Sequence, residues 1–416
     1  MTKNTIDSLN KISIDYFDIN YSELLPDDLR NELSKVDLSI FDEAVINKAI
    51  DVNFEYELIV EKISGTLYNY AREKLEKSKL LGFLLELGKA LNNLGTWKIS
   101  EKYFNVIVEL TKDEKPFIDY VANSYLSLGE IYFRQANWKT SFENLEKAKE
   151  IFSTEKFHEG LIRTNNMIGA VFGEKGEFTS AEKYFLESLE LIENKDHFNL
   201  LTGMVEDNIG LINFSRSLYD EAFAYFNRSL QIFDSFSARN RLSEAHFNIG
   251  LVYQKKKNYD SALVEFDNSL KNAIESEYIS MLNLNLSVKA NLTLDTDDFD
   301  QSIAFLNKSM ELSKKINDRL TIADLYKIKG LLSKKMKKKR EAEKYFFKSL
   351  RMNKELDNKF NYYETLYELG QLYKEWNKTD LAMENLTKAF NYKKSIGAEN
   401  AAKEIKLELN KLHEKH

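Results

Sequence analysis

Few side chains in this sequence combine the residue types and spacing that chemistry requires. The histidines His158, His197, His246, His413 and His416 stand apart, and none has a carboxylate or second histidine at metal-ligand spacing. We interpret them as surface or interhelix residues. The sequence has no cysteine, which excludes disulfides, zinc–thiolate sites and thiol nucleophiles. No glycine-rich phosphate loop, serine-elbow motif or paired-acid constellation stands out, so the sequence predicts no catalytic residue, no metal site and no cofactor.

Two charged stretches are candidates for binding an ion or a charged partner. The stretch "DTDDFD" (295–300) has the acids of a calcium loop, but such a loop needs glycine at its sixth position and glutamate at its twelfth. Asp300 and Leu306 stand there. The stretch "KKMKKKR" (334–340) carries six basic residues, and we interpret it as a solvated turn. The alternative is a docking patch for an acidic partner, or for the acidic N-terminal part of this chain.

Composition and charge favour a helical protein that binds neither nucleic acid nor membrane. The chain has 416 residues, 43% of them hydrophobic, with only 2 prolines and 15 glycines. Residues 1–60 hold 13 acidic and 5 basic side chains, a net of −8, so with −7 overall the remainder nets +1. Neither part has the basic excess typical of nucleic-acid binders. The most apolar stretch, 80–88, is far shorter than the roughly 20 residues of a membrane span, and the N-terminus lacks the pattern of a signal peptide. We expect a cytoplasmic protein.

Any site in this chain is positioned by a repeated structural unit, which is visible in a series of regularly spaced glycines. Seven glycines and one alanine follow one another at intervals of 40 or 41 residues. They are Gly88, Gly129, Gly169, Gly210, Gly250, Ala290, Gly330 and Gly370, which define repeats 1 to 8. A glycine inside a helix costs roughly 1 kcal/mol relative to alanine. Each of these positions therefore has a packing reason to lack a side chain.

Other positions keep the same register. Small residues stand twelve after each of these positions: Ser100, Ser141, Ala181, Ala222, Ala262, Ser302, Ala342 and Ala382. Bulky residues stand sixteen after: Phe104, Leu145, Phe185, Phe226, Phe266, Leu306, Phe346 and Leu386. Two helices approach closely only where side chains are small, with larger ones filling the flanking spaces. Each repeat is therefore predicted to be a pair of antiparallel helices that cross at the glycine.

This pattern of Leu-Gly, aromatic, small and bulky residues resembles the tetratricopeptide repeat (TPR) family. The resemblance covers about residues 77–397, in units of 40 residues where 34 is common. Units of this length are similar to those of kinesin light chains, the Leu-Gly-Asn-repeat adaptors and the Rap-type regulators of bacteria. The resemblance implies an all-α fold, a right-handed TPR solenoid whose first helices line a concave groove, and a protein or peptide ligand in that groove.

The flanks do not keep the register. We expect residues 1–75 to form an acidic N-terminal helical module, 76–397 the eight repeats, and 398–416 a capping helix with a polar outer face. In the first of these, Ser22 and Pro26 signal a helix start. One or two further helices are predicted from residue 41 onward.

The candidate binding residues lie on one face of the first helices of repeats 2 to 5, as judged from the helical period. That face mixes asparagine, which binds an extended peptide backbone, with arginine and phenylalanine anchors. We predict that the partner-binding residues are Arg134, Arg163, Asn166, Asn208, Phe214, Phe247 and Asn248.

The predicted function is a non-enzymatic scaffold that binds a protein or peptide segment in its TPR groove. The alternative is a peptide-responsive regulator of a bacterial signalling or transcription protein, similar to the Rap type. The N-terminal module and the 40-residue units allow the second reading. The identity of the partner and the oligomeric state are not readable from these residues.

Overall fold

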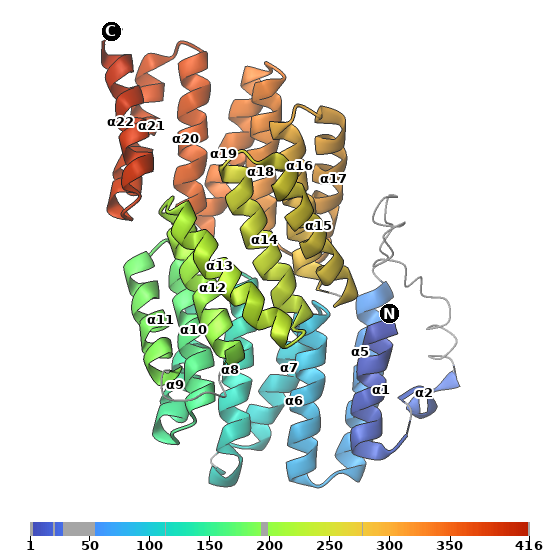
Figure 1. The fold of residues 1–416 in the computed structure, drawn as a ribbon. Helices are drawn as coiled ribbons and strands as arrows, with labels where there is room; N and C mark the ends of the chain where they lie inside the picture. The colour runs from blue at the N-terminus through green and yellow to red at the C-terminus, as the bar shows by residue number, and fades with distance from the viewer. Residues whose placement is uncertain are drawn as a thin grey trace. The chain divides into compact units, whose positions relative to one another are not determined.

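The computed structural model describes residues 3–19, 21–27, 55–112, 114–192, 199–276 and 278–414. In this part of the chain the secondary structure is helical, without strands, as Figure 1 shows. The predicted all-α class is therefore confirmed. No helix in the described ranges has the length and apolar character needed to cross a membrane.

The N-terminal helices are α1 (Lys3–Phe17), the short α2 (Tyr21–Leu24) and α5 (Glu55–Lys74). Ser22 lies within α2, and Pro26 follows it. The helix predicted to start after Pro26 and those predicted from residue 41 to residue 54 fall outside the described residues.

From residue 77 onward the helices follow one another in pairs. The pairs are α6 (Lys77–Asn93) with α7 (Trp97–Leu110), α8 (Ile118–Arg134) with α9 (Trp138–Thr154), α10 (His158–Glu174) with α11 (Phe178–Ile192), α12 (Asn199–Ser215) with α13 (Tyr219–Ser235), α14 (Arg239–Lys255) with α15 (Tyr259–Glu275), α16 (Ile279–Asp295) with α17 (Phe299–Lys315), α18 (Arg319–Lys335) with α19 (Lys339–Glu355), and α20 (Lys359–Glu375) with α21 (Thr379–Ser395). A short 3₁₀ helix, η2 (Lys115–Phe117), precedes α8, and α22 (Glu399–His413) follows the last pair.

The length of the repeat follows from its helices and turns. In repeat 7, α18 and α19 each have 17 residues, and three-residue turns follow each of them, at 336–338 and 356–358. The middle residue of each turn is in the left-handed conformation, with φ of 61° at Lys337 and 48° at Asp357. The turn at 336–338 closes with bonds from Lys337 N to Lys334 O and from Lys338 N to Ser333 O. These bonds satisfy the last carbonyls of the helix, as in a Schellman motif.

The glycines are the points where the two helices of a pair cross. A Cβ added to Gly250 would lie 2.6 Å from the ring of Phe266, and one added to Gly210 would lie 2.5 Å from the ring of Phe226. The small residue twelve positions later lies beside the same point, because Ser141 Oγ donates to the carbonyl of Gly129 at 2.7 Å. Each glycine thus makes room for the bulky side chain sixteen residues on.

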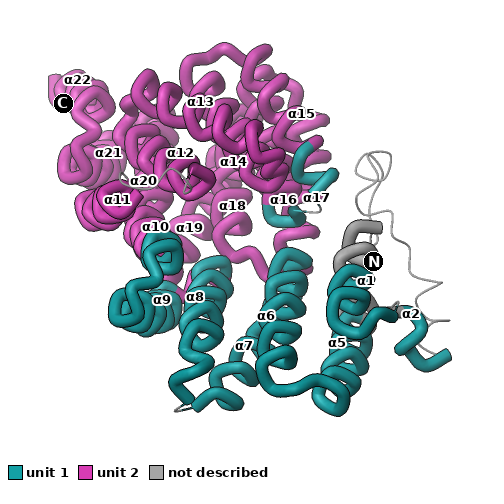
Figure 2. The backbone as a smooth tube through the Cα atoms, turned by 60° about the horizontal axis from the view of Figure 1, so that its bottom comes forward, with its two compact units in different colours: residues 1–134, 138–164, 272–280 teal, residues 135–137, 165–271, 281–416 magenta. Residues whose placement is uncertain are grey.

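The described chain forms two compact units, coloured separately in Figure 2. Unit 1 comprises residues 1–134, 138–164 and 272–280, and unit 2 comprises 135–137, 165–271 and 281–416. These units are defined by packing density. The three-part division made from sequence, at residues 75 and 397, stays a prediction.

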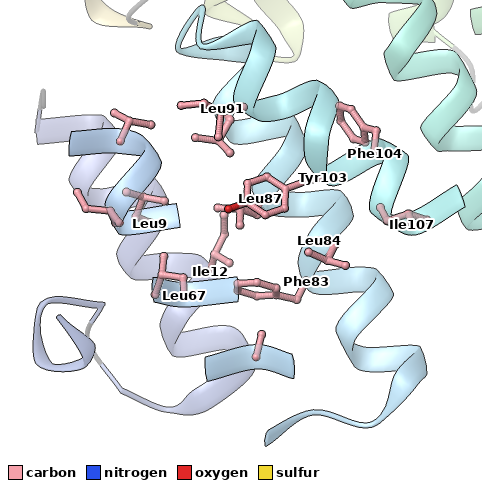
Figure 3. Close-up of a cluster of buried hydrophobic side chains, with 14 of the residues drawn as sticks. Leu9, Ile12, Leu67, Phe83, Leu84, Leu87, Leu91, Tyr103, Phe104 and Ile107 are labelled. Atoms are coloured by element: carbon pink, nitrogen blue, oxygen red, sulfur yellow. The ribbon is translucent and has the colours of Figure 1, made fainter. Parts of the chain in front are cut away.

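Unit 1 is built around a core in which N-terminal helices pack against the first repeat. Figure 3 shows Leu9 and Ile12 of α1 and Leu67 of α5 beside Phe83 and Leu87 of α6, all of them buried. The aromatic rings of Phe17 and Phe83 lie 5.5 Å apart between centroids. The N-terminal helices therefore cover the apolar face that the first repeat would otherwise expose, as a solenoid end requires.

Candidate functional site

Three of the predicted binding residues lie on consecutive first helices of unit 2. Asn166, Asn208 and Asn248 belong to α10, α12 and α14. Nδ2 of Asn208 donates a hydrogen bond to Oδ1 of Asn166 over 2.9 Å. Asn166 is buried and Asn208 half-buried. This bond connects side chains 42 residues apart, so it fixes the asparagines of neighbouring repeats to each other.

The next rung adds a carboxylate, Asp207, which is not among the predicted binding residues. Nδ2 of Asn248 donates to Oδ2 of Asp207 over 3.0 Å, and Ser229 Oγ of α13 donates to Oδ1 over 3.3 Å. Burial and the nearby carboxylate of Glu244 raise the pKa of Asp207 to about 7, against the effect of these hydrogen bonds. We call Asn166, Asp207, Asn208 and Asn248 the asparagine ladder.

The ladder has hydrogen-bonding capacity that the described residues do not use. Nδ2 of Asn166, Oδ1 of Asn208 and Oδ1 of Asn248 have no hydrogen-bond partner in the described part of the chain, although Asn166 and Asn248 are only 4% and 6% exposed. An amide side chain has two donor hydrogens and one acceptor oxygen. The ladder therefore offers both a donor and acceptors, which is what the N–H and C=O groups of an extended backbone require.

General packing distances indicate how much of an extended chain passes between neighbouring rungs. Packed helices lie about 8–10 Å apart, and an extended strand rises about 3.3 Å per residue. Neighbouring rungs are therefore separated by about three residues of an extended peptide.

The two predicted arginines lie in unit 1 and differ from each other. Nη2 of Arg134 donates to Glu130 Oε1 over 2.9 Å, and Nη1 donates to the hydroxyl of Tyr278 over 3.3 Å. Its Nε is buried and has no partner in the described residues. Arg163 is exposed, and its Nη1 lies 3.8 Å from Glu159 Oε1. Arg163 is thus the arginine whose guanidinium is more accessible.

The two predicted phenylalanines belong to the packing of their own repeats. Phe247 is only 9% exposed, and its ring centroid lies 5.8 Å from that of Phe266. Phe214 is half-buried and lies 5.5 Å from the ring of Tyr219. Their role as ligand anchors stays a prediction. The half-buried Phe214 fits that role better than Phe247, which is enclosed.

Unit 2 also gathers carboxylates from distant repeats, which sequence reasoning missed. Glu174, at the end of α10, lies close enough to Asp318 and Asp324 of repeat 7 to interact with both. Burial, with added repulsion from these two carboxylates, raises the pKa of Glu174 to about 7. Asn358 Nδ2 lies 3.5 Å from Glu174 Oε2. In the sequence, Glu174 stands five residues after Gly169, the glycine of its repeat. Arg134 stands at the same position of repeat 2, and this shared position was the signal that pointed to Glu174.

A second group of charges alternates in sign. Glu364 of α20 forms an ion pair with Lys393 of α21, a side chain only 10% exposed. Burial alone would raise the pKa of Glu364, but the ammonium groups of Lys393, Lys255 and Lys327 lower it to about 2. Lys255 belongs to α14, so first helices of repeats 5, 7 and 8 contribute charges to one neighbourhood of unit 2.

Glu174 and the two carboxylates near it, Asp318 and Asp324, predict a pH-dependent stability. A folded-state pKa near 7, above the ordinary 4.5, means that the folded chain keeps a proton that the unfolded chain loses. Stability should therefore fall as the pH rises from 4.5 through 7. Glu174→Gln should remove part of this slope and stabilise the chain at pH 8 by on the order of 1 kcal/mol, discounted for partial exposure. Urea unfolding at pH 5 and pH 8 measures it, and equal slopes for both proteins would contradict the assignment.

The other charged candidates from the sequence are engaged in local structure. Asp295 accepts from Gln254 over 2.9 Å, and Asp298 accepts from the backbone N–H of Gln301 at the start of α17. In the basic stretch, Lys335 donates to Leu294 O over 2.6 Å. The described residues contain no group of three or more His, Cys, Asp or Glu placed to hold a metal ion.

The histidines are not brought together in the described chain. Nδ1 of His246 lies 2.7 Å from Glu265 Oε2, which joins α14 to α15. His158 begins α10 and His413 ends α22. His197 and His416 fall outside the described residues.

Comparison with known proteins identifies the repeats. A tetratricopeptide-repeat family model matches residues 120–194 and 201–275, and a second one matches 363–396. No curated protein matches the sequence. The fold does resemble that of solved structures. A Rap protein complexed with competence and sporulation factor is 13% identical, with a TM-score of 0.60 over 89% of this chain and 99% of that one.

A second solved structure covers nearly all of both chains. The Rap conjugation gene regulator of the plasmid pLS20, in complex with the Phr* peptide, is 15% identical, with a TM-score of 0.57 over 97% of this chain and 98% of that one. At these identities the likeness concerns the fold. Residues 120–194, 201–275 and 363–396 are therefore tetratricopeptide repeats, and the chain shares the all-α solenoid fold of the Rap structures.

Proposed function

We propose that this protein binds an extended peptide, or an extended segment of a protein, along the first helices of repeats 3 to 5. The observation that carries the proposal is the asparagine ladder, whose amide groups are fixed between repeats and yet keep unused donors and acceptors. Fixed amides bind a backbone without first losing side-chain entropy, which favours affinity. Binding of this kind needs no catalytic group.

Arg163 lies on α10, the helix that also carries Asn166, and stays a predicted partner-binding residue. Its exposed guanidinium is held only by a 3.8 Å contact with Glu159. A carboxylate of the ligand can therefore replace that contact with two parallel hydrogen bonds. Arg134 is less suited to this role, because Glu130 and Tyr278 already occupy both of its terminal nitrogens.

Loss of a ladder residue is expected to weaken peptide binding at least tenfold, which corresponds to about 1.4 kcal/mol. The probe is a peptide selected from a displayed library of random ten-residue sequences against the full chain. Its affinity is then measured by calorimetry for wild type, Asn208→Ala and Arg163→Ala. Both variants should lose affinity while keeping the wild-type circular-dichroism spectrum. Arg163→Ala should also keep the wild-type melting, whereas Asn208→Ala should melt lower because it loses the bond to Asn166.

Asn227→Ala is the matched control. Asn227 is also a half-buried asparagine, but it lies on the second helix α13 and donates only to the carbonyl of Phe223 in its own helix, over 2.8 Å. It should bind the peptide like wild type. If Asn208→Ala and Arg163→Ala both bind like the control, the first-helix face is not the binding surface.

A second candidate function is a peptide-responsive regulator. Two Rap structures, one complexed with competence and sporulation factor and one with the Phr* peptide, share the fold over 89% and 97% of this chain. Under this reading, peptide binding changes how the N-terminal module presents itself to a protein partner. A compaction on adding the selected peptide, measured by small-angle scattering, favours the regulator. Tight binding at unchanged dimensions favours the scaffold.

A further inference from the structure

Repeat 7 concentrates positive charge in a chain that is acidic as a whole. Residues 319–358 hold 13 basic and 5 acidic side chains, a net of +8, whereas the whole chain nets −7. The other residues therefore net −15. Six of the basic side chains lie on α19, the second helix of this repeat (Figure 1). Such a local reversal of charge raises the electrostatic potential around one helix and attracts anionic groups.

Five exposed residues follow one another along α19 at intervals of four, three, four and three positions. They are Arg340, Lys344, Phe347, Arg351 and Lys354. Because an α-helix has 3.6 residues per turn, this spacing places the five on one face. The opposite face is buried and includes Ala342, Phe346 and Leu350. We call the five exposed residues the α19 stripe.

The stripe reverses the charge that most other repeats carry at two of its positions. At the position of Arg340, ten after the repeat glycine, four repeats have aspartate: Asp220, Asp260, Asp300 and Asp380. At the position of Arg351, four repeats have glutamate: Glu109, Glu150, Glu190 and Glu311. Acidic residues are favoured in the first turn of a helix, so an arginine at position 340 opposes the helix dipole. The helix itself therefore gains no stability from Arg340.

The cations of the stripe are scarcely neutralised within the protein. In the described part of the chain, Arg340, Lys344 and Lys354 form no ion pair. Arg351 has one carboxylate nearby, with its Nε 3.9 Å from Glu355 Oε1, and both side chains are more than half exposed. An exposed pair at that distance contributes little. The four cations are therefore available to carboxylates of another molecule.

Further cations lie beside the stripe. Lys348 of α19 lies over two tyrosine rings, 5.1 Å from the centroid of Tyr326 and 5.7 Å from that of Tyr345. Burial, together with the ammonium groups of Lys314 and Lys348, lowers the pKa of Lys329 on α18. Lysines of α17, α18 and α19 thus repel one another, and a bound anion would relieve part of that repulsion.

An exposed aromatic ring stands at the centre of the stripe. Phe347 is 52% exposed and stands seventeen positions after Gly330. Repeat 3 has Leu186 at this position, and the six others have a polar residue: Asn105, Glu146, Asn227, Asp267, Asn307 and Thr387. The position is thus an outward one, and the packing of the repeat does not require a phenylalanine there. Aromatic residues and arginines are the usual anchors of protein interfaces, and the stripe combines both.

The dimensions of the stripe fit a narrow acidic partner. Residues 340–354 extend over about 21 Å, the length of about six extended residues or four helical turns. The second helices of the adjacent repeats carry exposed acids at matching positions: Asp300 and Glu311 on α17, and Asp380 and Glu384 on α21. The positive surface is therefore one helix wide. A DNA duplex or an anionic bilayer is a broad polyanion that would also meet these acids, whereas a single acidic segment would not.

We propose that the α19 stripe is a docking surface for an acidic segment of a partner protein. Carboxylates of that segment pair with the four cations of the stripe, and one of its apolar side chains covers Phe347. Charge complementarity then steers the encounter and fixes the register, while the apolar contact supplies affinity. The stripe lies on a second helix, so it is separate from the asparagine ladder on the first helices and does not rest on peptide binding there.

Two synthetic peptides test the proposal by fluorescence anisotropy with the full chain. Each has twelve residues and a fluorescein label, and eleven of its residues are glutamate or aspartate. The central residue is phenylalanine in the first peptide and serine in the second. The phenylalanine peptide should bind about threefold more tightly or better, and Phe347→Ser should remove this difference. Arg340→Glu with Arg351→Glu should weaken the binding of both peptides by about tenfold or more, because repulsion replaces attraction.

Lys139→Glu with Lys183→Glu is the matched control. Lys139 stands at the Arg340 position of repeat 2, and Lys183 stands at the Lys344 position of repeat 3. Their side chains are 88% and 74% exposed, so this pair changes the net charge by the same amount on the second helices α9 and α11. The control should bind both peptides within about twofold of wild type, since exposed charges far from the stripe are screened by salt.

Three results, each in variants with the wild-type circular-dichroism spectrum, would overturn the proposal. If the control pair weakens binding as much as Arg340→Glu with Arg351→Glu, only the net charge matters. If wild type binds the two peptides equally or binds neither, Phe347 is not an anchor. If a DNA duplex or phosphatidylserine vesicles bind the stripe more tightly than the phenylalanine peptide, its partner is a broad polyanion and not an acidic protein segment.

Discussion

Replacing Lys393 by methionine is expected to lower the free energy of unfolding by about 3 kcal/mol, the usual cost of breaking a buried ion pair by removing one partner. Lys393 is 8% exposed, pairs with Glu364 and lies 4.8 Å above the ring of Phe360. Methionine keeps most of the apolar stem but leaves the carboxylate of Glu364 without its nearest cation. Guanidinium unfolding followed by circular dichroism measures the change.

The same measurement has a matched control and an internal rescue. Lys388 lies on the same helix and pairs with Glu384 over 2.6 Å, but both side chains are more than half exposed. Lys388→Met should change stability by less than about 0.5 kcal/mol. Adding Glu364→Gln to Lys393→Met should recover much of the loss, because it removes the unpaired charge. A double variant no more stable than Lys393→Met would contradict the buried-pair account.

The pH dependence of this pair has the opposite sign to that of Glu174. Because nearby ammonium groups hold the pKa of Glu364 at about 2, below its ordinary 4.5, its contribution to stability is complete above pH 4.5. That contribution is lost as the pH falls from 4.5 through 2. Acid titration of wild type should therefore show a loss of stability in this range that Lys393→Met reduces.

Gly250→Ala is expected to destabilise the chain by about 1–3 kcal/mol, the usual cost of overpacking a core. Helix propensity alone predicts the reverse, a gain of about 1 kcal/mol. The added methyl carbon would lie 2.6 Å from the ring of Phe266, which is a fully buried side chain. The same unfolding experiment decides between the two signs.

Gly65→Ala is the control for this substitution. Gly65 also lies inside a helix, α5, but a Cβ there would meet nothing within 4 Å. Its replacement should stabilise by up to about 1 kcal/mol. Repeat 6 suggests the rescue, since it has Ala290 at the glycine position and Leu306 sixteen residues later. Gly250→Ala with Phe266→Leu should therefore be more stable than Gly250→Ala. If Gly250→Ala melts at a higher temperature than wild type, the two helices do not pack tightly where they cross at Gly250.

The helix pairs were predictable because their contacts are local and repeated. The partner of Gly250 lies sixteen residues away, and the same separation recurs in eight repeats, so spacing alone identified it. The contact between Lys359 and Glu177 was not predictable in this way. Lys359 and Glu177 are 182 residues apart, and their meeting depends on the small rotation between repeats, which accumulates along the solenoid.

The candidate site was predicted only in part, for a reason that the phenylalanines illustrate. Helical period places Asn248 and Phe247 on one side of α14, yet adjacent residues differ by about 100° around a helix. The structure directs Phe247 toward Phe266 and Asn248 toward Asp207. Glu174 belongs to repeat 3, and the carboxylates that interact with it, Asp318 and Asp324, belong to repeat 7. A helix face that is assigned within one repeat gives no information about charges that meet from different repeats.

The central claim is that a peptide backbone binds the amides of the asparagine ladder, and side-chain amide resonances test it most directly. The chain is labelled with ¹⁵N only in asparagine, and single Asn→Ala variants assign the signals. On addition of the selected peptide, the side-chain signals of Asn166, Asn208 and Asn248 should shift, while that of Asn227 should not. If the selected peptide binds but leaves these three signals in place while it shifts others, the result would contradict the account.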